Sequence, residues 1–301
     1  MARSDNLTGA VLMMASMASF TLNDTLMKVM AGQVPLFQLL FLRGILTTVA
    51  VALAAWWTGA LAARLPRRDR GLIVWRTVAE IGAAYFFLTA LFNMPIANVT
   101  AILQALPLTI ALAAALFLKE PVGWRRFAAI GVGFVGVMLI VRPGAADFNF
   151  HSLYALAAVG FVTLRDLSTR RLSPGTPSML VTLVTSAAVM AAFGLASLTG
   201  EWAPMSGREI GLTAGAALMI IGGYLFSIMV MRVGEIGVVA PFRYTGLIWA
   251  LLLGWAVFGE WPEPLTLLGA AIVAGSGGYT LWRDSRLARS ARLARTRPRG
   301  M

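Results

Sequence analysis

The chain has 301 residues, of which 58% are hydrophobic and 13% are charged, and its mean hydropathy is +0.78. A soluble domain carries about 25% charged residues, so this composition excludes an ordinary soluble fold and indicates a membrane protein built from helices or a closed barrel. The apolar runs are too long for the alternating strands of a barrel. A net charge of +12 would suggest nucleic acid in a soluble protein, but the arginines stand between apolar runs, so we expect no nucleic-acid partner.

The apolar runs set the number of membrane crossings. Each is close to the ~20 residues that cross a hydrocarbon core, and turn residues such as Gly32, Pro35 and Pro95 mark the breaks between them. The sequence therefore predicts an all-α membrane protein with ten transmembrane helices, at residues 8–30, 34–58, 71–92, 96–118, 124–141, 150–170, 178–198, 209–232, 237–258 and 264–282.

The basic residues predict the orientation in the bilayer. If the N-terminus is cytoplasmic, 18 of the 25 Lys and Arg residues fall in cytoplasmic segments and three on the opposite side. This bias follows the positive-inside rule, so we expect a bacterial inner-membrane protein with both termini in the cytoplasm. Seven of these residues follow Trp282, in a tail that we interpret as a solvated topology anchor. A helix lying on anionic lipid headgroups is the alternative.

The two halves of the chain repeat the same features at offsets of 139 to 142 residues. Asp24 and Lys28 correspond to Asp166 and Arg170, for example. Five spans per half are an odd number, so the halves must have opposite orientations, a recurrent plan of carriers whose substrate site lies where the halves meet. We predict a first repeat at 1–145 (helices 1–5), a second at 146–283 (helices 6–10) and a basic cytoplasmic tail at 284–301.

Ionisable residues inside the spans are functional candidates, because each costs about 2.5–3.5 kcal/mol to insert into lipid. Arg76 and Glu80 are neighbours at i,i+4 and are expected to pair with each other. Asp24 either pairs with Lys28 in the same way or has a functional role. A buried Asp24 or Glu80 could carry a coupling proton, but a permanently charged carboxylate is as compatible with the sequence.

Two embedded arginines lack a local partner. Arg43 and Arg243 have no acidic residue three or four positions away, so each must find a carboxylate on another helix, a backbone carbonyl or a substrate. Arg165 and Asp166 lie in the sixth span. The embedded arginines exceed the embedded acids by one. Substrate binding, gating and structural pairing all remain open for these residues.

Aromatic and polar residues extend the candidate set. Tyr85, Tyr224 and Tyr244 could stack on a flat ring system, with helix packing as the alternative. Gln104 and Pro107 interrupt one apolar run and Pro241 interrupts another, where a proline kink could expose polar backbone to a cavity, with a simple tolerated kink as the alternative. The candidate substrate-binding or gating residues are Asp24, Arg43, Arg76, Glu80, Tyr85, Gln104, Asp166, Tyr224, Arg243 and Tyr244.

The sequence predicts neither an enzyme nor a metal or cofactor site. The acids are scattered, His151 is the single histidine and cysteine is absent. The run from Gly131 to Gly136 spells GxGxxG but lies inside a predicted helix with no preceding strand, so it is not a dinucleotide fingerprint. Small residues at these positions instead allow helices to approach closely.

The motifs resemble those of the EamA branch of the drug/metabolite transporter superfamily over nearly the whole chain. The matching residues are Asn23-Asp24, Phe41-Leu42-Arg43, Lys119-Glu120-Pro121, Asp147-Phe148-Asn149, Arg165-Asp166, Ala240-Pro241-Phe242-Arg243-Tyr244 and Gly259-Glu260-Trp261-Pro262. The resemblance implies an inner-membrane secondary carrier that moves a small organic metabolite by alternating access.

Within that branch the motifs are similar to those of bacterial carriers for riboflavin uptake and for S-adenosylmethionine uptake. A membrane interior with surplus arginine disfavours a cation, and S-adenosylmethionine is cationic overall. We therefore place riboflavin uptake first, S-adenosylmethionine uptake second and export of an amino acid or another metabolite third. A non-transporting receptor or assembly subunit is the alternative of another class. The sequence does not fix the oligomeric state or the coupling ion.

Overall fold

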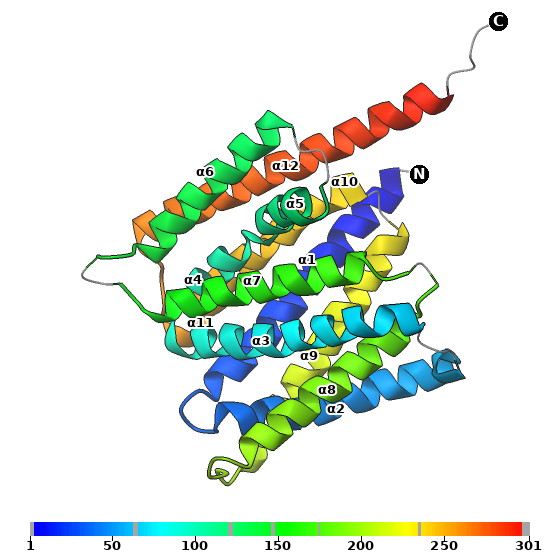
Figure 1. The fold of residues 1–301 in the computed structure, drawn as a ribbon. Coiled ribbons are helices and arrows are strands. Elements are labelled where there is room, and N and C mark those ends of the chain that lie inside the picture. Colours follow the sequence, from blue (N-terminus) through cyan, green and yellow to red (C-terminus); the bar gives the residue numbers. More distant parts are fainter. Residues whose placement is uncertain are drawn as a thin grey trace, which may run out of the picture.

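A computed structural model describes residues 3–62, 66–119, 123–145, 148–173, 175–233 and 236–296. All regular elements in these ranges are helices, coloured along the chain in Figure 1. They are α1 (Arg3–Val29), α2 (Leu36–Trp57), η1 (Ala60–Ala62), η2 (Arg67–Asp69), α3 (Arg70–Asn93), α4 (Ile96–Leu103), α5 (Leu106–Phe117), α6 (Trp124–Val141), α7 (His151–Arg170), α8 (Ser178–Ser197), α9 (Gly207–Val233), α10 (Ile236–Val239), η3 (Ala240–Tyr244), α11 (Thr245–Phe258) and α12 (Pro264–Thr296).

Eight of the ten predicted spans coincide with helical segments that are long and apolar enough to cross a membrane. Within the described ranges these segments are α2, η2 with α3, α4 with α5, α6, α8, α9, η3 with α11, and α12. Apolar length alone therefore supports eight crossings and not the predicted ten. The other two predicted spans correspond to α1 and α7, which contain 27 and 20 residues but carry several charged and amide side chains, and this lowers their hydropathy.

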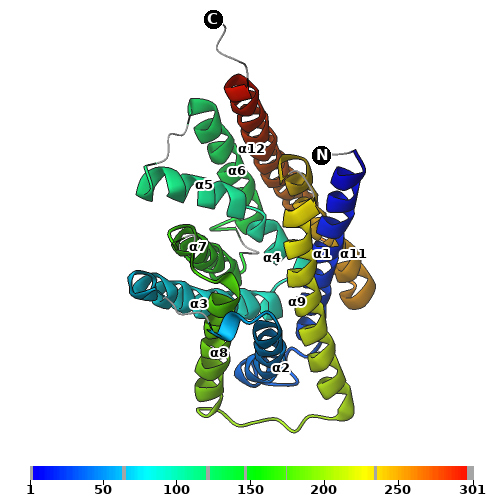
Figure 2. The ribbon, with the colours of Figure 1, turned by 90° about the vertical axis from the view of Figure 1, so that its right-hand side faces the viewer.

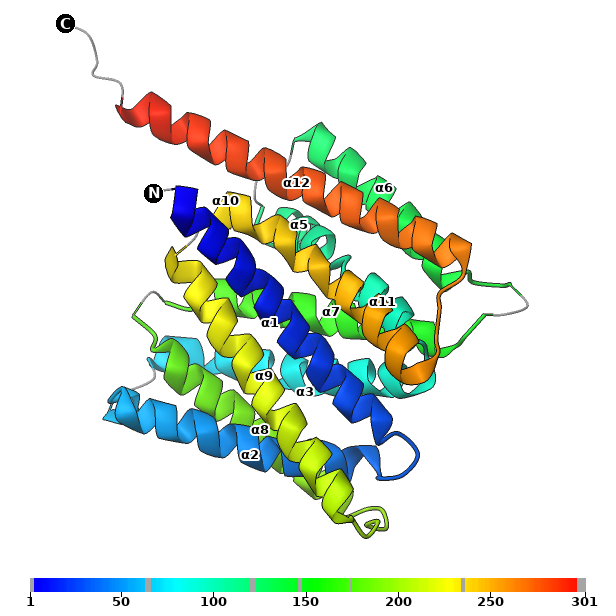
Figure 3. The ribbon, with the colours of Figure 1, turned by 180° about the vertical axis from the view of Figure 1, so that it is seen from behind.

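The helices pack mainly in pairs. The closest pairs are α1 with α9, α3 with α7, α2 with α8, and α6 with α12. In Figure 2, α3 and α7 lie on one side, α1 and α9 on the other, and α4 between them. The pair α2 and α8 forms one edge of the bundle, and the pair α6 and α12 forms the opposite edge (Figures 1 and 3). The first helix begins and α12 ends at the same end of the bundle, as both of these views show.

Glycines allow several of these pairs to approach closely. A Cβ built on Gly136 of α6 would lie 2.7 Å from the carbonyl oxygen of Gly269 in α12. The run that contains Gly136 is thus a helix-packing surface, as predicted, and it lies inside α6. Two aromatic rings also pack directly on glycines. A Cβ on Gly82 would lie 2.7 Å from the ring of Phe161, and one on Gly223 would lie 2.7 Å from the ring of Phe20.

Both predicted interruptions break a helix in the structure. The segment 96–118 divides into α4 and α5 at Gln104 and Ala105, just before Pro107. Pro241 lies in the 3-10 helix η3, which precedes α11. Proline cannot donate the helical hydrogen bond, which accounts for the break in each place. The basic tail continues α12 as a helix to Thr296.

Candidate functional site

The embedded charged residues lie on helices that face each other across the bundle. Asp24 is on α1 and Arg43 on α2, whereas Arg76 and Glu80 are on α3 and Asp166 is on α7. The α1–α9 pair and the α3–α7 pair are the two sides seen in Figure 2. The helices that carry these charged side chains lie among apolar spans. The charged side chains therefore favour the interior of the bundle over its outer, lipid-facing surface.

On the first side, Asn23 joins Arg43 to Asp24. The Arg43 guanidinium donates a hydrogen bond to Asn23 Oδ1 at 3.0 Å, and the Asn23 amide donates to Asp24 Oδ1 at 2.8 Å. Asn23 is buried, with 3% of its surface exposed. Arg43 therefore finds a partner on another helix, as its lack of a local acid required, although the partner is an amide oxygen and not a carboxylate.

On the opposite side, Arg165 is bonded to two carboxylates. Its Nε donates to Asp166 Oδ1 at 2.9 Å, and a terminal nitrogen donates to the two oxygens of Glu80 at 3.3 and 3.4 Å. All three side chains are partly buried. Arg165 was not among the predicted site residues, but it is the centre of this cluster because it satisfies both Glu80 and Asp166.

The predicted pairing of Arg76 with Glu80 is wrong. Arg76 instead donates to the hydroxyl of Thr169 at 3.0 Å and to that of Thr185 at 2.7 Å. It thereby connects α3 to α7 and α8. Glu80 instead bonds to Arg165 of α7. Among the residues that the structure describes, no carboxylate forms an ion pair with Arg76.

Tyr224 lies on α9, the helix that packs against α1. Its ring packs edge to face on Phe20 with centroids 5.3 Å apart, and 52% of the residue is accessible.

Arg243 of η3 interacts with the charges of Asp166 and Arg165. It donates no hydrogen bond to any residue that the structure describes, and it is exposed there. Arg243 is therefore the embedded cation most open to a substrate.

Three predicted residues form no hydrogen bond or ion pair with these charged side chains among the described residues: Tyr85, Gln104 and Tyr244. Tyr85 belongs to an aromatic group, with ring centroids 6.0 Å from Phe37 and 6.4 Å from Tyr154. Gln104 is buried at the break between α4 and α5. The hydroxyl of Tyr244 is buried and has no hydrogen-bond partner among the described residues, and it lies where a Cβ on Gly277 would be.

Lys28 does not pair with Asp24, which was one of the two interpretations of that spacing. Its Nζ lies 2.7 and 2.8 Å from the two oxygens of Glu260 and donates to the carbonyl of Met94 at 2.7 Å. Glu260 also accepts a hydrogen bond from the backbone nitrogen of Ile96 at 3.2 Å. These contacts tie the end of α1 to the start of α4 and to the loop between α11 and α12.

The motif residues Glu120 and Asp147 lie outside the described residues. Asn149, of the same motif as Asp147, lies two residues before the first residue of α7, and its Oδ1 accepts a hydrogen bond from the backbone nitrogen of His151 at 2.9 Å. Its amide donates to the carbonyl of Asn93 at 3.0 Å. Asn149 therefore joins the end of α3 to the start of α7.

Charged side chains from α1, α2, α3, α7 and η3 thus converge inside a bundle of apolar helices, which defines a multi-pass helical membrane protein with a polar interior. The chain belongs to the EamA-like transporter family, whose model matches residues 7–142.

Two relatives and one solved structure extend the comparison. The chain is 25% identical over 294 residues to an S-adenosylmethionine uptake transporter of Rickettsia felis, covering 93% of this chain and 94% of that protein. It is 30% identical over 220 residues to a riboflavin transporter of Vibrio cholerae, covering 72% and 73%. A crystal structure with 20% identity matches with a TM-score of 0.65 over 94% of this chain and 99% of that chain. The relatives confirm the predicted family and a transport role, and the solved structure supports the fold alone.

Proposed function

We propose that this protein is a secondary transporter that moves a small organic metabolite across the bacterial inner membrane by alternating access, with riboflavin uptake as the best candidate. The observation that carries the proposal is the presence of two charged clusters among apolar helices, Arg43 with Asn23 and Asp24 on one side and Arg165 with Glu80 and Asp166 on the other. Buried charges are costly in lipid, so charged clusters drawn from the four helices α1, α2, α3 and α7 favour a polar path for a solute. The family supplies the class of function.

Two inverted repeats, 1–145 and 146–283, fit the helix packing. Phe161 stands 141 positions after Phe20, and Gly223 stands 141 positions after Gly82. The ring-on-glycine contact of α1 with α9 therefore has a counterpart in the contact of α7 with α3. Exchanging the halves also maps the pair α2–α8 onto itself, and likewise the pair α6–α12. This symmetry supports α1 and α7 as equivalent first helices and hence a total of ten crossings.

The same plan accounts for the orientation that we propose. An even number of crossings returns the chain to its starting side, which agrees with the start of α1 and the end of α12 lying at one end of the bundle. Residues 284–296 of the basic tail form the last part of α12 at this end, so the positive-inside rule assigns this end to the cytoplasm.

Charge and aromatic rings favour riboflavin over S-adenosylmethionine. Glu80 and Asp166 are both bonded to Arg165, whereas Arg243 has no bonded partner among the described residues. The site thus offers an open cation, which repels a cationic substrate and binds carbonyl or hydroxyl oxygens. The exposed ring of Tyr224 offers a face for a flat ring system. S-adenosylmethionine remains the second candidate because its transporter matches nearly the whole chain.

The test is uptake of radiolabelled riboflavin by bacteria that cannot synthesise or import it, with and without this protein. Unlabelled riboflavin should compete, and S-adenosylmethionine and amino acids should not. We expect Arg243→Ala and Arg43→Ala to abolish uptake at wild-type membrane levels. The matched control is Arg208→Ala, at the exposed start of α9. Wild-type flux in both site variants would remove the site claim, and uptake of S-adenosylmethionine alone would replace the substrate.

A further inference from the structure

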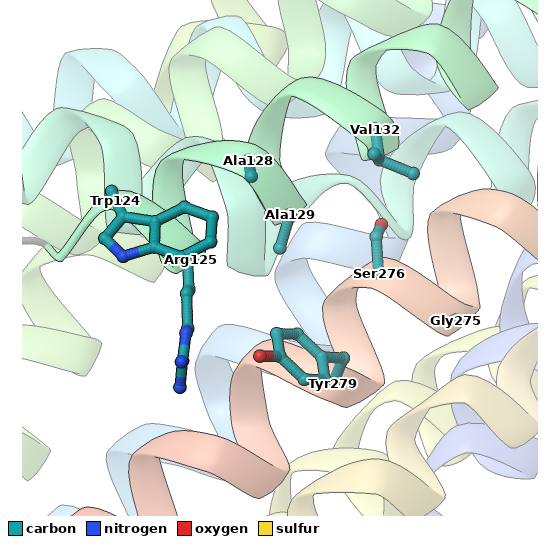
Figure 4. Close-up of a pocket in the computed structure, with 8 residues that line it drawn as sticks. All are labelled: Trp124, Arg125, Ala128, Ala129, Val132, Gly275, Ser276 and Tyr279. Carbon is teal, nitrogen blue, oxygen red and sulfur yellow. The ribbon is translucent and has the colours of Figure 1, made fainter.

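A groove on the outer edge of the bundle has no role in the proposed transport path. It runs between α6 and α12, has a volume of about 440 Å³ and is shown in Figure 4. Its floor consists of small residues, Ala128 and Ala129 from α6 and Gly275 and Ser276 from α12. Trp124 and Tyr279 lie at one end and Val132 lies toward the other (Figure 4).

Two arginines lie at the aromatic end of this groove. The Arg125 guanidinium lies 5.5 Å from the ring centroid of Trp124. Arg283 follows Tyr279 by one helical turn, and its terminal nitrogen comes within 3.7 Å of the position of a Cβ on Gly123, at the start of α6. Neither arginine pairs with an acid among the residues that the structure describes. The groove therefore combines an apolar floor with two positive charges at one end.

The groove opens toward the surroundings of the protein and not toward the polar interior. The pair α6 and α12 forms one edge of the bundle in all three ribbon views. Trp124 is 74% exposed and Val132 is 53% exposed. In a membrane-spanning protein this edge contacts lipid. Exposed aromatic residues beside arginines at a helix end are typical of the level of the lipid headgroups.

We propose that this groove binds one anionic phospholipid. The phosphate lies between Arg125 and Arg283, since guanidinium groups bind phosphate with paired hydrogen bonds. An acyl chain lies along Ala129 and Gly275, where the small side chains leave room for it. The proposal goes beyond the transport function, because nothing in it requires the substrate or its path.

The experiment is native mass spectrometry of the full-length protein in mild detergent, titrated with phosphatidylglycerol or with phosphatidylcholine of the same acyl chains. Two variants test the site. Arg125→Gln/Arg283→Gln removes the charges, and Gly275→Leu fills the groove. A Cβ at Gly275 meets no atom within 4 Å, so this variant adds bulk without an internal clash. The matched controls are Arg67→Gln/Arg70→Gln, which removes two exposed charges elsewhere, and Gly211→Leu, which is equally open.

We expect wild-type protein to bind phosphatidylglycerol more tightly than phosphatidylcholine. Removing both arginines should weaken the affinity for phosphatidylglycerol about 30-fold, which is the scale on which two basic side chains near an anionic lipid surface contribute. The charge variant should lose this preference, Gly275→Leu should bind neither lipid at this site, and both controls should match wild type. Equal binding of the two lipids by wild type, or unchanged binding by both site variants, would overturn the proposal. A dimer that Gly275→Leu converts to a monomer would also overturn it, because a second chain would then be the occupant.

Discussion

The ion pair between Lys28 and Glu260 allows a quantitative test of how the ends of distant helices are held together. The Lys28 side chain is 8% exposed and the Glu260 side chain 27% exposed, with a shortest separation of 2.7 Å. The Lys28 ammonium also lies 4.8 Å from the ring centroid of Phe258. We consider Lys28→Met, which keeps the apolar stem, and Glu260→Gln, which keeps an acceptor for the nitrogen of Ile96.

The burial of the pair sets the expected magnitude. Removing one partner of a fully buried pair costs about 3–5 kcal/mol, because the other charge is left without compensation. The partial exposure of Glu260 lets water reach the remaining charge, so we expect about 2 kcal/mol for each single variant. The double variant leaves no unpaired charge. Its cost should therefore fall below the sum of the single costs by about 1–2 kcal/mol.

The assay is reversible unfolding of the purified protein by SDS in mixed micelles, followed by circular dichroism. Glu263→Gln is the matched control, because Glu263 is 62% exposed in its contact with Arg142, and its loss should stay within about 0.5 kcal/mol. Additive single costs would refute the reasoning, since they would show that the two side chains do not depend on each other.

Three further predictions use the same unfolding assay. Gly82→Ala places a Cβ 2.7 Å from the ring of Phe161 and should lower the free energy of unfolding by about 1–3 kcal/mol. Gly160→Ala, whose Cβ meets nothing within 4 Å, should not destabilise the protein. Equal effects of the two substitutions would contradict the packing argument. Asp69→Ala should lower the free energy of unfolding by about 1–3 kcal/mol. The buried Asp69 carboxylate accepts hydrogen bonds from Thr176 and from the nitrogen and hydroxyl of Ser173. An unchanged unfolding curve would argue against this link between the segments before α3 and α8. Tyr244→Phe should leave stability equal or higher by up to about 1 kcal/mol, because its buried hydroxyl has no partner among the described residues; a clear loss would reveal a bonded water or a second partner.

Local spacing predicted the helices well and their side-chain partners poorly. The apolar runs and the prolines at 95, 107 and 241 located the spans and their breaks, because these depend on residues close in sequence. The pairing of Arg76 with Glu80 was wrong for the same reason. The i,i+4 rule considers one helix only, whereas Arg165, the actual partner of Glu80, lies 85 residues away.

The candidate site was predicted in part. The absence of a local acid near Arg43 and Arg243 singled out two cations of the interior, and Arg43 does find its partner on another helix. The sequence contained Asn23 only as the neighbour of Asp24 in a motif. Its role as the bridge between Arg43 and Asp24 was not predicted. The pair of Lys28 with Glu260 joins residues 232 positions apart, and no periodicity or propensity within either segment contains that information.

The pairing of the helices has a consequence for biosynthesis. Each of the four closest pairs joins a helix that ends before residue 145 to one that begins after residue 148. The ribosome therefore delivers α1, α2, α3 and α6 before their partners exist, and the glycine surfaces at 82 and 136 stay uncovered until α7 and α12 have been made. Native packing is completed only near the end of translation, and an amino-terminal fragment made alone lacks the main packing partner of each of these four helices.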